Sequence, residues 1–269
     1  MTGELSTPAV AALAAVAGLV GLLVGSFLNV VVARVPEGRS VVTPRSACPA
    51  CGTPIRPAEN VPVVSWLLLR GRAACCGAPI SRRYPLVEVI TAAAFAAVTA
   101  WQGLSWLLPA LLYLAAISIA LTFIDLDHFR LPDQIVLPSY GVVAALLGVA
   151  AVGEGEYRPL LRAAAAGAAL WVFYFTLRVI NPRGMGYGDV KLAGVLGMYF
   201  GWFGWGEVAL GTFLGFAVGG VAGIGLMLAG RAGRKTQIPF GPYMIVGAWL
   251  GLAVGGAVWD WYLDLSGYR

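Results

Sequence analysis

The sequence predicts an all-α, polytopic integral membrane protein, and three observations lead to that fold class. Hydrophobic residues fill 59% of the 269 positions. Charged residues fill only 12%, about half the fraction found in a typical soluble protein. The apolar residues form long runs separated by short charged loops, and a helix needs about 20 mostly apolar residues to cross a bilayer. The chain therefore has room for several membrane spans and little soluble mass.

The apolar runs predict about eight transmembrane helices. The first run is too long for the apolar part of a signal peptide, and no Lys or Arg precedes it, so we interpret it as a membrane span. The sixth run is short, about 14 residues, so it should tilt, break or lie buried between other helices. The predicted spans lie near residues 9–33, 85–101, 106–124, 134–152, 159–180, 190–203, 208–229 and 238–258.

The basic residues predict the orientation of these spans. Loops on the cytoplasmic side of membrane proteins carry an excess of Lys and Arg. If the one large loop, residues 34–84, is cytoplasmic, the inside segments hold 15 of the 18 basic residues. This loop also contains all four cysteines, so we expect a small cytoplasmic Cys-containing loop domain. Because the basic residues lie in short loops between apolar spans, we expect membrane lipid and not nucleic acid as the surroundings.

Two aspartates lie in distinctive sequence at predicted cytoplasmic helix ends. Asp125 ends the third span, and Asp189 begins the sixth directly after Gly186 and Gly188. Ionisable groups at membrane depth are costly and usually mark function. Glycines let the backbone turn sharply, and a helix N-terminus favours a negative charge. The predicted topology places both aspartates at the same membrane boundary, where the fold could bring them together.

Two close carboxylates would allow aspartyl peptidase chemistry. They share one proton because they cannot both ionise cheaply, so one acts as a base toward water and the other as an acid toward the scissile carbonyl. The alternative is that such aspartates cap helices and pair with basic residues, which suits Asp127 and Asp133. Lys191 is either a charge partner of an aspartate or a basic side chain reaching the interface. The single histidine, His128, argues against hydrolases built on histidine.

Five motifs in a fixed order give the chain a resemblance to a known family. They are Gly-Ser-Phe-Leu-Asn-Val-Val-Val-Ala-Arg-Val-Pro, Ser-Arg-Arg-Tyr-Pro-Leu-Val-Glu, the aspartate-to-Leu-Pro-Asp stretch, Gly-Tyr-Gly-Asp and Pro-Phe-Gly-Pro. With these motifs the chain resembles the type IV prepilin peptidases, the bifunctional leader peptidase/N-methyltransferases of bacterial pilus and type II secretion systems. The match covers nearly the whole length, with the motifs at residues 25–36, 81–88, 125–133, 186–189 and 239–242.

The resemblance implies a site, a reaction and a location. It implies that Asp125 and Asp189 are catalytic, that Gly186 and Gly188 position Asp189, and that Lys191 supports the site. The implied reaction removes a short basic leader from a prepilin or pseudopilin on the cytoplasmic face of the bacterial inner membrane. N-methylation of the new N-terminal residue by S-adenosylmethionine follows, and the product serves a pilus or type II secretion assembly. We expect residues 1–84 to be linked with methyl transfer and residues 85–269 to form the peptidase domain.

The cysteines suggest zinc with one departure from the family pattern. Cys48 and Cys51 form a Cys-x-x-Cys pair, and the reducing cytoplasm argues against a disulfide. Two such pairs would predict a tetrathiolate zinc site, as in many family members. In the second pair, Cys76 holds the last position, Ala73 replaces the expected third cysteine, and Cys75 is a shifted thiol that could supply the fourth bond. We favour zinc over a loop held by packing or a weakly binding vestigial site.

Other assignments stay open at this point. The sequence has no Gly-rich dinucleotide fingerprint, so it assigns no residue to S-adenosylmethionine. Asn29 and Glu88 are either structural pairs, which we favour, or methyl-transfer residues. A transporter using the same aspartates as an ion or proton relay is the leading alternative, and a catalytically silent scaffold is the second. The set of motifs disfavours both.

Overall fold

The computed structural model of the chain describes residues 7–267 apart from positions 183, 232, 234, 235 and 237. Within these residues the chain is helical with no strand; two isolated bridges join Ala47 to Pro54 and Arg72 to Pro79. The predicted all-α fold is therefore confirmed. Of the basic residues counted for the orientation, Arg183, Arg234, Lys235 and Arg269 lie outside the described residues.

Seven of the helices are long and apolar enough to cross a membrane, which indicates a multi-pass membrane protein. They correspond to seven of the predicted spans. Two 3-10 helices, η1 (Val35–Glu37) and η2 (Pro57–Asn60), and the short helix α2 (Val64–Leu68) lie in the large loop. The long helices are α1 (Thr7–Arg34), α3 (Arg83–Gln102), α4 (Leu108–His128), α5 (Asp133–Glu154), α6 (Arg158–Ile180), α7 (Tyr187–Phe203), α8 (Trp205–Leu228) and α9 (Gly241–Leu265).

Helix α7 corresponds to the short sixth span, and it differs from the other long helices. It has 17 residues, of which twelve are buried, and it is not among the seven candidate spans. The structure thus agrees with the expectation that this helix lies between others. Glycines make this possible, because any larger residue would clash with the backbone of α6. A Cβ on Gly197 would lie 2.7 Å from the Ala166 oxygen, and a Cβ on Gly201 would lie 2.6 Å from the Arg162 oxygen.

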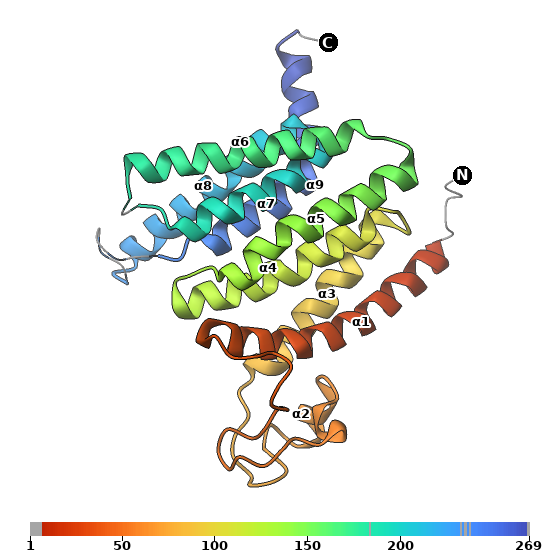
Figure 1. The fold of residues 1–269 in the computed structure, drawn as a ribbon, viewed down its shortest axis with the longest axis vertical. Helices are drawn as coiled ribbons and strands as arrows, with labels where there is room; N and C mark the ends of the chain where they lie inside the picture. The colour runs from red at the N-terminus through yellow and green to blue at the C-terminus, as the bar shows by residue number, and fades with distance from the viewer. Residues whose placement is uncertain (1–6, 183, 232, 234–235, 237, 268–269) are drawn as a thin grey trace. The chain divides into compact units, whose positions relative to one another are not determined.

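The chain packs as two compact units, Met1–Ala120 and Leu121–Arg269, and each is described by itself. In the first unit α1 packs antiparallel against α3. A Cβ on Gly21 would lie 2.7 Å from the Ala92 Cα, and one on Gly25 would lie 2.7 Å from the Glu88 Cα. The large loop leaves the unit at the end where α1 stops and α3 begins (Figure 1). These small residues allow the two helices to approach closely.

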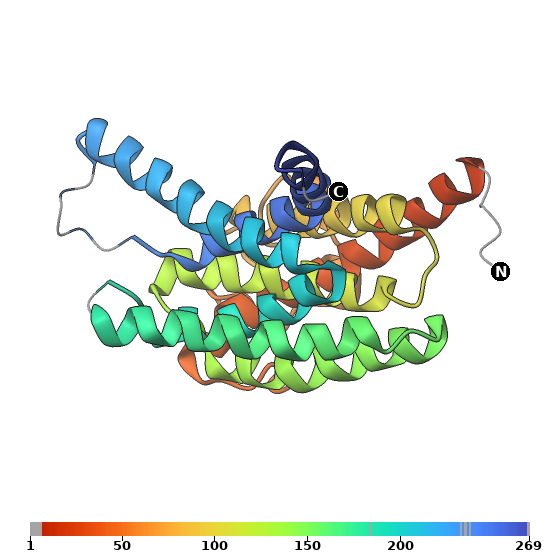
Figure 2. The same ribbon diagram turned by 90° about the horizontal axis from the view of Figure 1, so that it is seen from above.

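The second unit surrounds α7 with four other helices. Helix α7 contacts α5, α6, α8 and α9, and Figures 1 and 2 show it enclosed by them. Helices α8 and α9 meet through paired glycines, Gly211 against Gly251 and Gly215 against Gly247. With no hydrophobic drive between helices in lipid, close packing through small residues is the main attraction left. This packing places the starts of α7 and α9, which carry part of the candidate site.

Candidate functional site

Asp125 lies in the last turn of α4, in the second unit, and joins α4 to α9. Its side chain is only 4% exposed, and its Oδ2 accepts a hydrogen bond from the backbone N–H of Gly241 at 3.0 Å. Gly241 is the first residue of α9, so this N–H is one of the donors that a helix leaves unpaired at its start. A Cβ at Gly241 would lie 2.8 Å from the Asp125 Oδ2, so any larger residue would displace the carboxylate from this position.

Asp189 lies in the first turn of α7 and closes the glycine-rich turn before it. It is 8% exposed, and its Oδ2 accepts a hydrogen bond from the backbone N–H of Gly186 at 3.0 Å. A Cβ at Gly186 would lie 3.0 Å from the same oxygen. One carboxylate oxygen thus serves the helix start, as the capping alternative expects. Capping by this oxygen and catalysis by the other are compatible roles.

Leu131, in the link between α4 and α5, brings the surroundings of the two aspartates together. Its Cδ2 lies 3.2 Å from the Cβ position of Gly241, which holds Asp125. Its Cβ lies 3.0 Å from the Cβ position of Gly188, the residue before Asp189. The carboxylates of Asp125 and Asp189 are near enough to interact electrostatically. The structure therefore groups both predicted aspartates at one end of the second unit.

Two residues of α6 that the sequence analysis did not select also lie at this site. Tyr174 is buried and interacts electrostatically with Asp189. Arg178, one turn further along α6, donates from Nη1 to the Met185 carbonyl at 2.9 Å and also acts on the Asp189 carboxylate. In the sequence, both residues lie near the predicted cytoplasmic end of the fifth span, which is the side of the membrane where the site is expected. That position does not show which neighbouring helix their side chains face.

Lys191 pairs with an aspartate other than the two candidates. Its Nζ forms an ion pair with Asp133, the first residue of α5, and lies 4.6 Å from the ring centroid of Tyr187. Its backbone oxygen accepts a hydrogen bond from the Tyr140 hydroxyl at 2.7 Å. These contacts tie α7 to α5 near the site. Lys191 is thus a charge partner of Asp133 and holds the start of α7.

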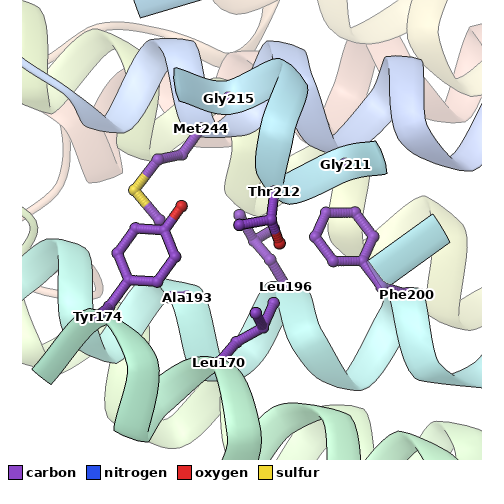
Figure 3. A pocket seen from close by; sticks show the side chains of 9 residues that line it. All are labelled: Leu170, Tyr174, Ala193, Leu196, Phe200, Gly211, Thr212, Gly215 and Met244. Atoms are coloured by element: carbon purple, nitrogen blue, oxygen red, sulfur yellow. The ribbon is translucent and has the colours of Figure 1, made fainter. Parts of the chain in front are cut away.

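A small cavity lies deeper in the same unit, between α6, α7, α8 and α9 (Figure 3). The residues of α7 that line the cavity, Ala193, Leu196 and Phe200, lie on the same face of the helix as Asp189. Figure 3 shows the Tyr174 hydroxyl beside Met244. Its volume of about 10 Å³ is close to the minimum for a single water molecule. The cavity is therefore too small for a substrate side chain. Its lining is Leu170, Tyr174, Ala193, Leu196, Phe200, Gly211, Thr212, Gly215 and Met244.

The four cysteines of the large loop come together in the first unit. The Sγ atoms of Cys48, Cys51, Cys75 and Cys76 all lie within 4.8 Å of one another. The Sγ atoms of Cys48 and Cys76 are 3.7 Å apart, and those of Cys51 and Cys75 are 3.2 Å apart. Four thiolates around zinc, with Zn–S bonds of about 2.3 Å, lie about 3.8 Å apart. The four thiols therefore fit a tetrathiolate metal site.

The two turns that carry the cysteines repeat the same backbone pattern. In the first turn the N–H of Cys48 bonds the Thr53 oxygen, and the N–H of Gly52 bonds the Cys48 oxygen. In the second turn Ala73 makes both equivalent bonds, with Ala78 and Gly77. Ala73 thus occupies the place of the missing cysteine, as the alignment of the motif predicts. Cys75 reaches the cluster from a different position of its turn.

Hydrogen bonding also affects the exposed thiols of this loop. Bonds with Thr53 lower the pKa of the Cys51 thiol to about 6, which favours the thiolate that a metal binds.

Asn29 and Glu88 both make hydrogen bonds with the backbone. The Asn29 amide donates to the Tyr84 oxygen at 3.1 Å, and the Glu88 carboxylate accepts from the Val63 N–H at 2.7 Å. These contacts match the structural alternative for both residues.

Comparisons with known proteins cover both units. A family model described as the bacterial peptidase A24 N-terminal domain matches residues 19–102, and one described as the type IV leader peptidase family matches residues 112–224. The chain is 40% identical to a prepilin leader peptidase/N-methyltransferase from Aeromonas hydrophila over 91% of this chain and 92% of that protein. It is 39% identical to one from Pseudomonas aeruginosa, over 93% of each chain. No solved structure matches the chain.

Proposed function

Because the chain belongs to the type IV leader peptidase family, we propose that it removes the basic leader of a prepilin or pseudopilin and then N-methylates the new N-terminus. In this proposal Asp125 and Asp189 are the catalytic pair. The observation that carries it is the pair of buried carboxylates at one end of a helical unit, each with its Oδ2 held by a glycine N–H. The transporter alternative finds no support among the relatives, which are named as peptidase/methyltransferases.

The geometry supports a division of labour within each carboxylate. Oδ2 of each aspartate is fixed by a backbone donor, so we assign the other oxygen to the reaction. One carboxylate accepts a proton from the attacking water while the protonated partner donates to the carbonyl oxygen of the scissile bond. Gly186 and Gly241 orient the two carboxylates through their N–H groups. Gly188 has no side chain, so Leu131 can pack between the start of α7 and the start of α9. Lys191 holds α7 to α5 through its ion pair with Asp133.

We assign the protein to the bacterial inner membrane with its active site facing the cytoplasm. The basic residues of the loop 34–84 and of the other predicted inside segments support this orientation. A substrate helix in the bilayer would then present its leader junction at the cytoplasmic interface. The cleaved product would serve a pilus or type II secretion assembly, which contacts this enzyme only indirectly.

We assign methyl transfer from S-adenosylmethionine to the part that includes residues 1–84. Zinc, held by Cys48, Cys51, Cys75 and Cys76, would cross-link the two turns of the loop, because four thiolates close a structural zinc site. Such a site stabilises a loop that has little apolar core of its own. The peptidase reaction involves residues of 85–269 and does not require the metal.

Leader cleavage tests the proposal. The protein would be purified in detergent and mixed with a model prepilin, and the product mass would be followed for wild type, Asp125→Asn and Asp189→Asn. We expect loss of the leader with wild type only, and a further gain of about 14 Da, one CH₂ group, when S-adenosylmethionine is added. Full cleavage by either variant, or none by wild type with several prepilins, would overturn the assignment.

A further inference from the structure

Helix α2 in the large loop has an apolar face that the described residues 7–120 of the first unit leave exposed. Leu68 is 78% exposed, Leu67 is 60% exposed and Val64 is 50% exposed. The opposite side of α2 faces the loop, where the Trp66 ring packs 2.9 Å from the Cβ position of Gly71. Two adjacent leucines left open on a five-residue helix are costly in water, at about 1.5–3 kcal/mol for each side chain that could be buried.

The backbone before and after α2 is strained. Val63 has φ 59° and ψ −49°, and the N–H of Val64 bonds the Pro62 oxygen at 2.6 Å, which is the geometry of a γ-turn. A positive φ is rare for a β-branched residue. Arg70, two residues after α2, also has a positive φ of 52°. Strain of this kind persists only where the surroundings fix it. At Val63 the fixing contact is its N–H, which donates to the Glu88 carboxylate.

Glu88 ties the turn before α2 to a helix that is long and apolar enough to cross a membrane. It lies in α3, a candidate span, five residues after Arg83, or about 7–8 Å along the helix axis. Gly25 of α1, a second candidate span, packs against its Cα. The hydrogen bond from Val63 to Glu88 therefore holds the start of α2 close to the ends of two candidate spans. Arg70 and Arg72 follow α2 and are exposed, and the Arg72 guanidinium donates to the Gly77 oxygen at 3.5 Å. Exposed arginines beside a bilayer attract anionic headgroups.

We propose that α2 lies in the membrane interface, with Leu67 and Leu68 in the boundary between lipid headgroups and acyl chains. The partner is bilayer lipid, because the turn before α2 is bonded to a candidate membrane span and because exposed arginines follow α2. The strained turn at Val63 aims the leucines at the bilayer, and Glu88 holds that turn. The contact fixes the Cys-bearing loop against the membrane surface, and it is independent of the peptidase reaction.

Photo-crosslinking to lipid tests this assignment. The full chain would be reconstituted into nanodiscs of phosphatidylethanolamine and phosphatidylglycerol, with benzoylphenylalanine in place of Leu68. The control carries the same label in place of Ile55, an exposed apolar residue of the first Cys turn. We expect several-fold more lipid adduct at position 68 than at position 55, measured by mass spectrometry of the intact protein.

A second labelled variant guards against misfolding. The label in place of Leu67 should also form lipid adducts, and monodisperse elution would confirm that each variant is folded. Equal adduct yields at positions 68 and 55, no lipid adduct at 67 and 68, or adducts with a second protein chain only would overturn the proposal. Leader cleavage plays no part in this readout, so failure of the proposed peptidase function would leave the result interpretable.

Discussion

The aspartate site and the cysteine cluster are built in opposite ways. The aspartates are buried at helix ends and are held by backbone N–H groups: Asp125 by that of the distant Gly241, and Asp189 by that of Gly186 in the turn just before it. Three of the four cysteines are exposed, and they lie on two tight turns whose hydrogen bonds are local. Helix packing therefore provides the precision of the first site, whereas the second needs a bound ion to join its turns. Changes in one region should leave the other intact.

The largest effect should come from the shifted cysteine. Cys75→Ser removes one of four thiols that lie within 4.8 Å, so we expect zinc affinity to fall at least about 100-fold. Adding Ala73→Cys to that variant should restore binding, because Ala73 occupies the equivalent place in the repeated turn. Metal content and competition with a chelator give the measurement. Unchanged zinc content in Cys75→Ser would show that three thiols suffice.

The glycine at the start of α9 should matter next. In Gly241→Ala the new methyl group would lie 2.8 Å from the Asp125 Oδ2, so the carboxylate must move. We expect kcat for leader cleavage to fall about 100-fold, as for a displacement of about 1 Å in a catalytic group, with zinc content unchanged. Gly220→Ala in α8 is the matched control, because a Cβ there meets nothing within 4 Å. Equal activities for the two variants would contradict the role of Gly241.

A smaller effect should follow from loosening the turn before Asp189. Arg178→Gln removes the guanidinium that bonds the Met185 oxygen at 2.9 Å. We expect about a tenfold lower kcat, because a charged hydrogen bond contributes about 1.5–3 kcal/mol and only part of it acts on Asp189. Arg178→Lys, which keeps the charge, should recover part of the rate. A loss of folded protein in place of a rate change would indicate a purely structural role.

The smallest effect should come from Lys191. The Lys191 side chain is 12% exposed and that of its partner Asp133 is 57% exposed, so solvent screens the pair from the aspartate side. Screened pairs contribute about 0–1 kcal/mol. Lys191→Met should therefore reduce leader cleavage less than about fivefold. Steady-state kinetics on the purified variant give the measurement. A loss on the scale of Asp189→Asn would mean that Lys191 acts on the catalytic pair itself.

Much of this architecture follows from local sequence. The all-α fold and seven spans follow from apolar runs, because a bilayer accepts only segments whose backbone is paired internally. The ends of α4 and α7, with Asp125 and Asp189, follow from a proline after one helix and glycines before the other. The equivalence of Ala73 with a missing cysteine follows from the spacing of the second turn. Each of these features depends on neighbours within a few residues.

Other features could not be predicted this way. The donor to Asp125 is Gly241, 116 positions away, and the sequence around Gly241 does not name its partner. Tyr174 and Arg178 face Asp189 only because α6 packs against α7 through Ala166, Gly197 and neighbouring small residues. The same packing explains why α7 is buried.

The sequence by itself therefore determined which long segments are helices, their ends to within several residues, and which ionisable groups lie near those ends. Hydrophobicity and backbone conformation are properties of short stretches, so the sequence contains them directly. Only the tertiary structure decided which helix ends meet, that the Gly241 N–H holds Asp125, and that Glu88 bonds the strained turn before α2. Those contacts depend on the close approach of distant helices, which glycines permit and which no local pattern specifies.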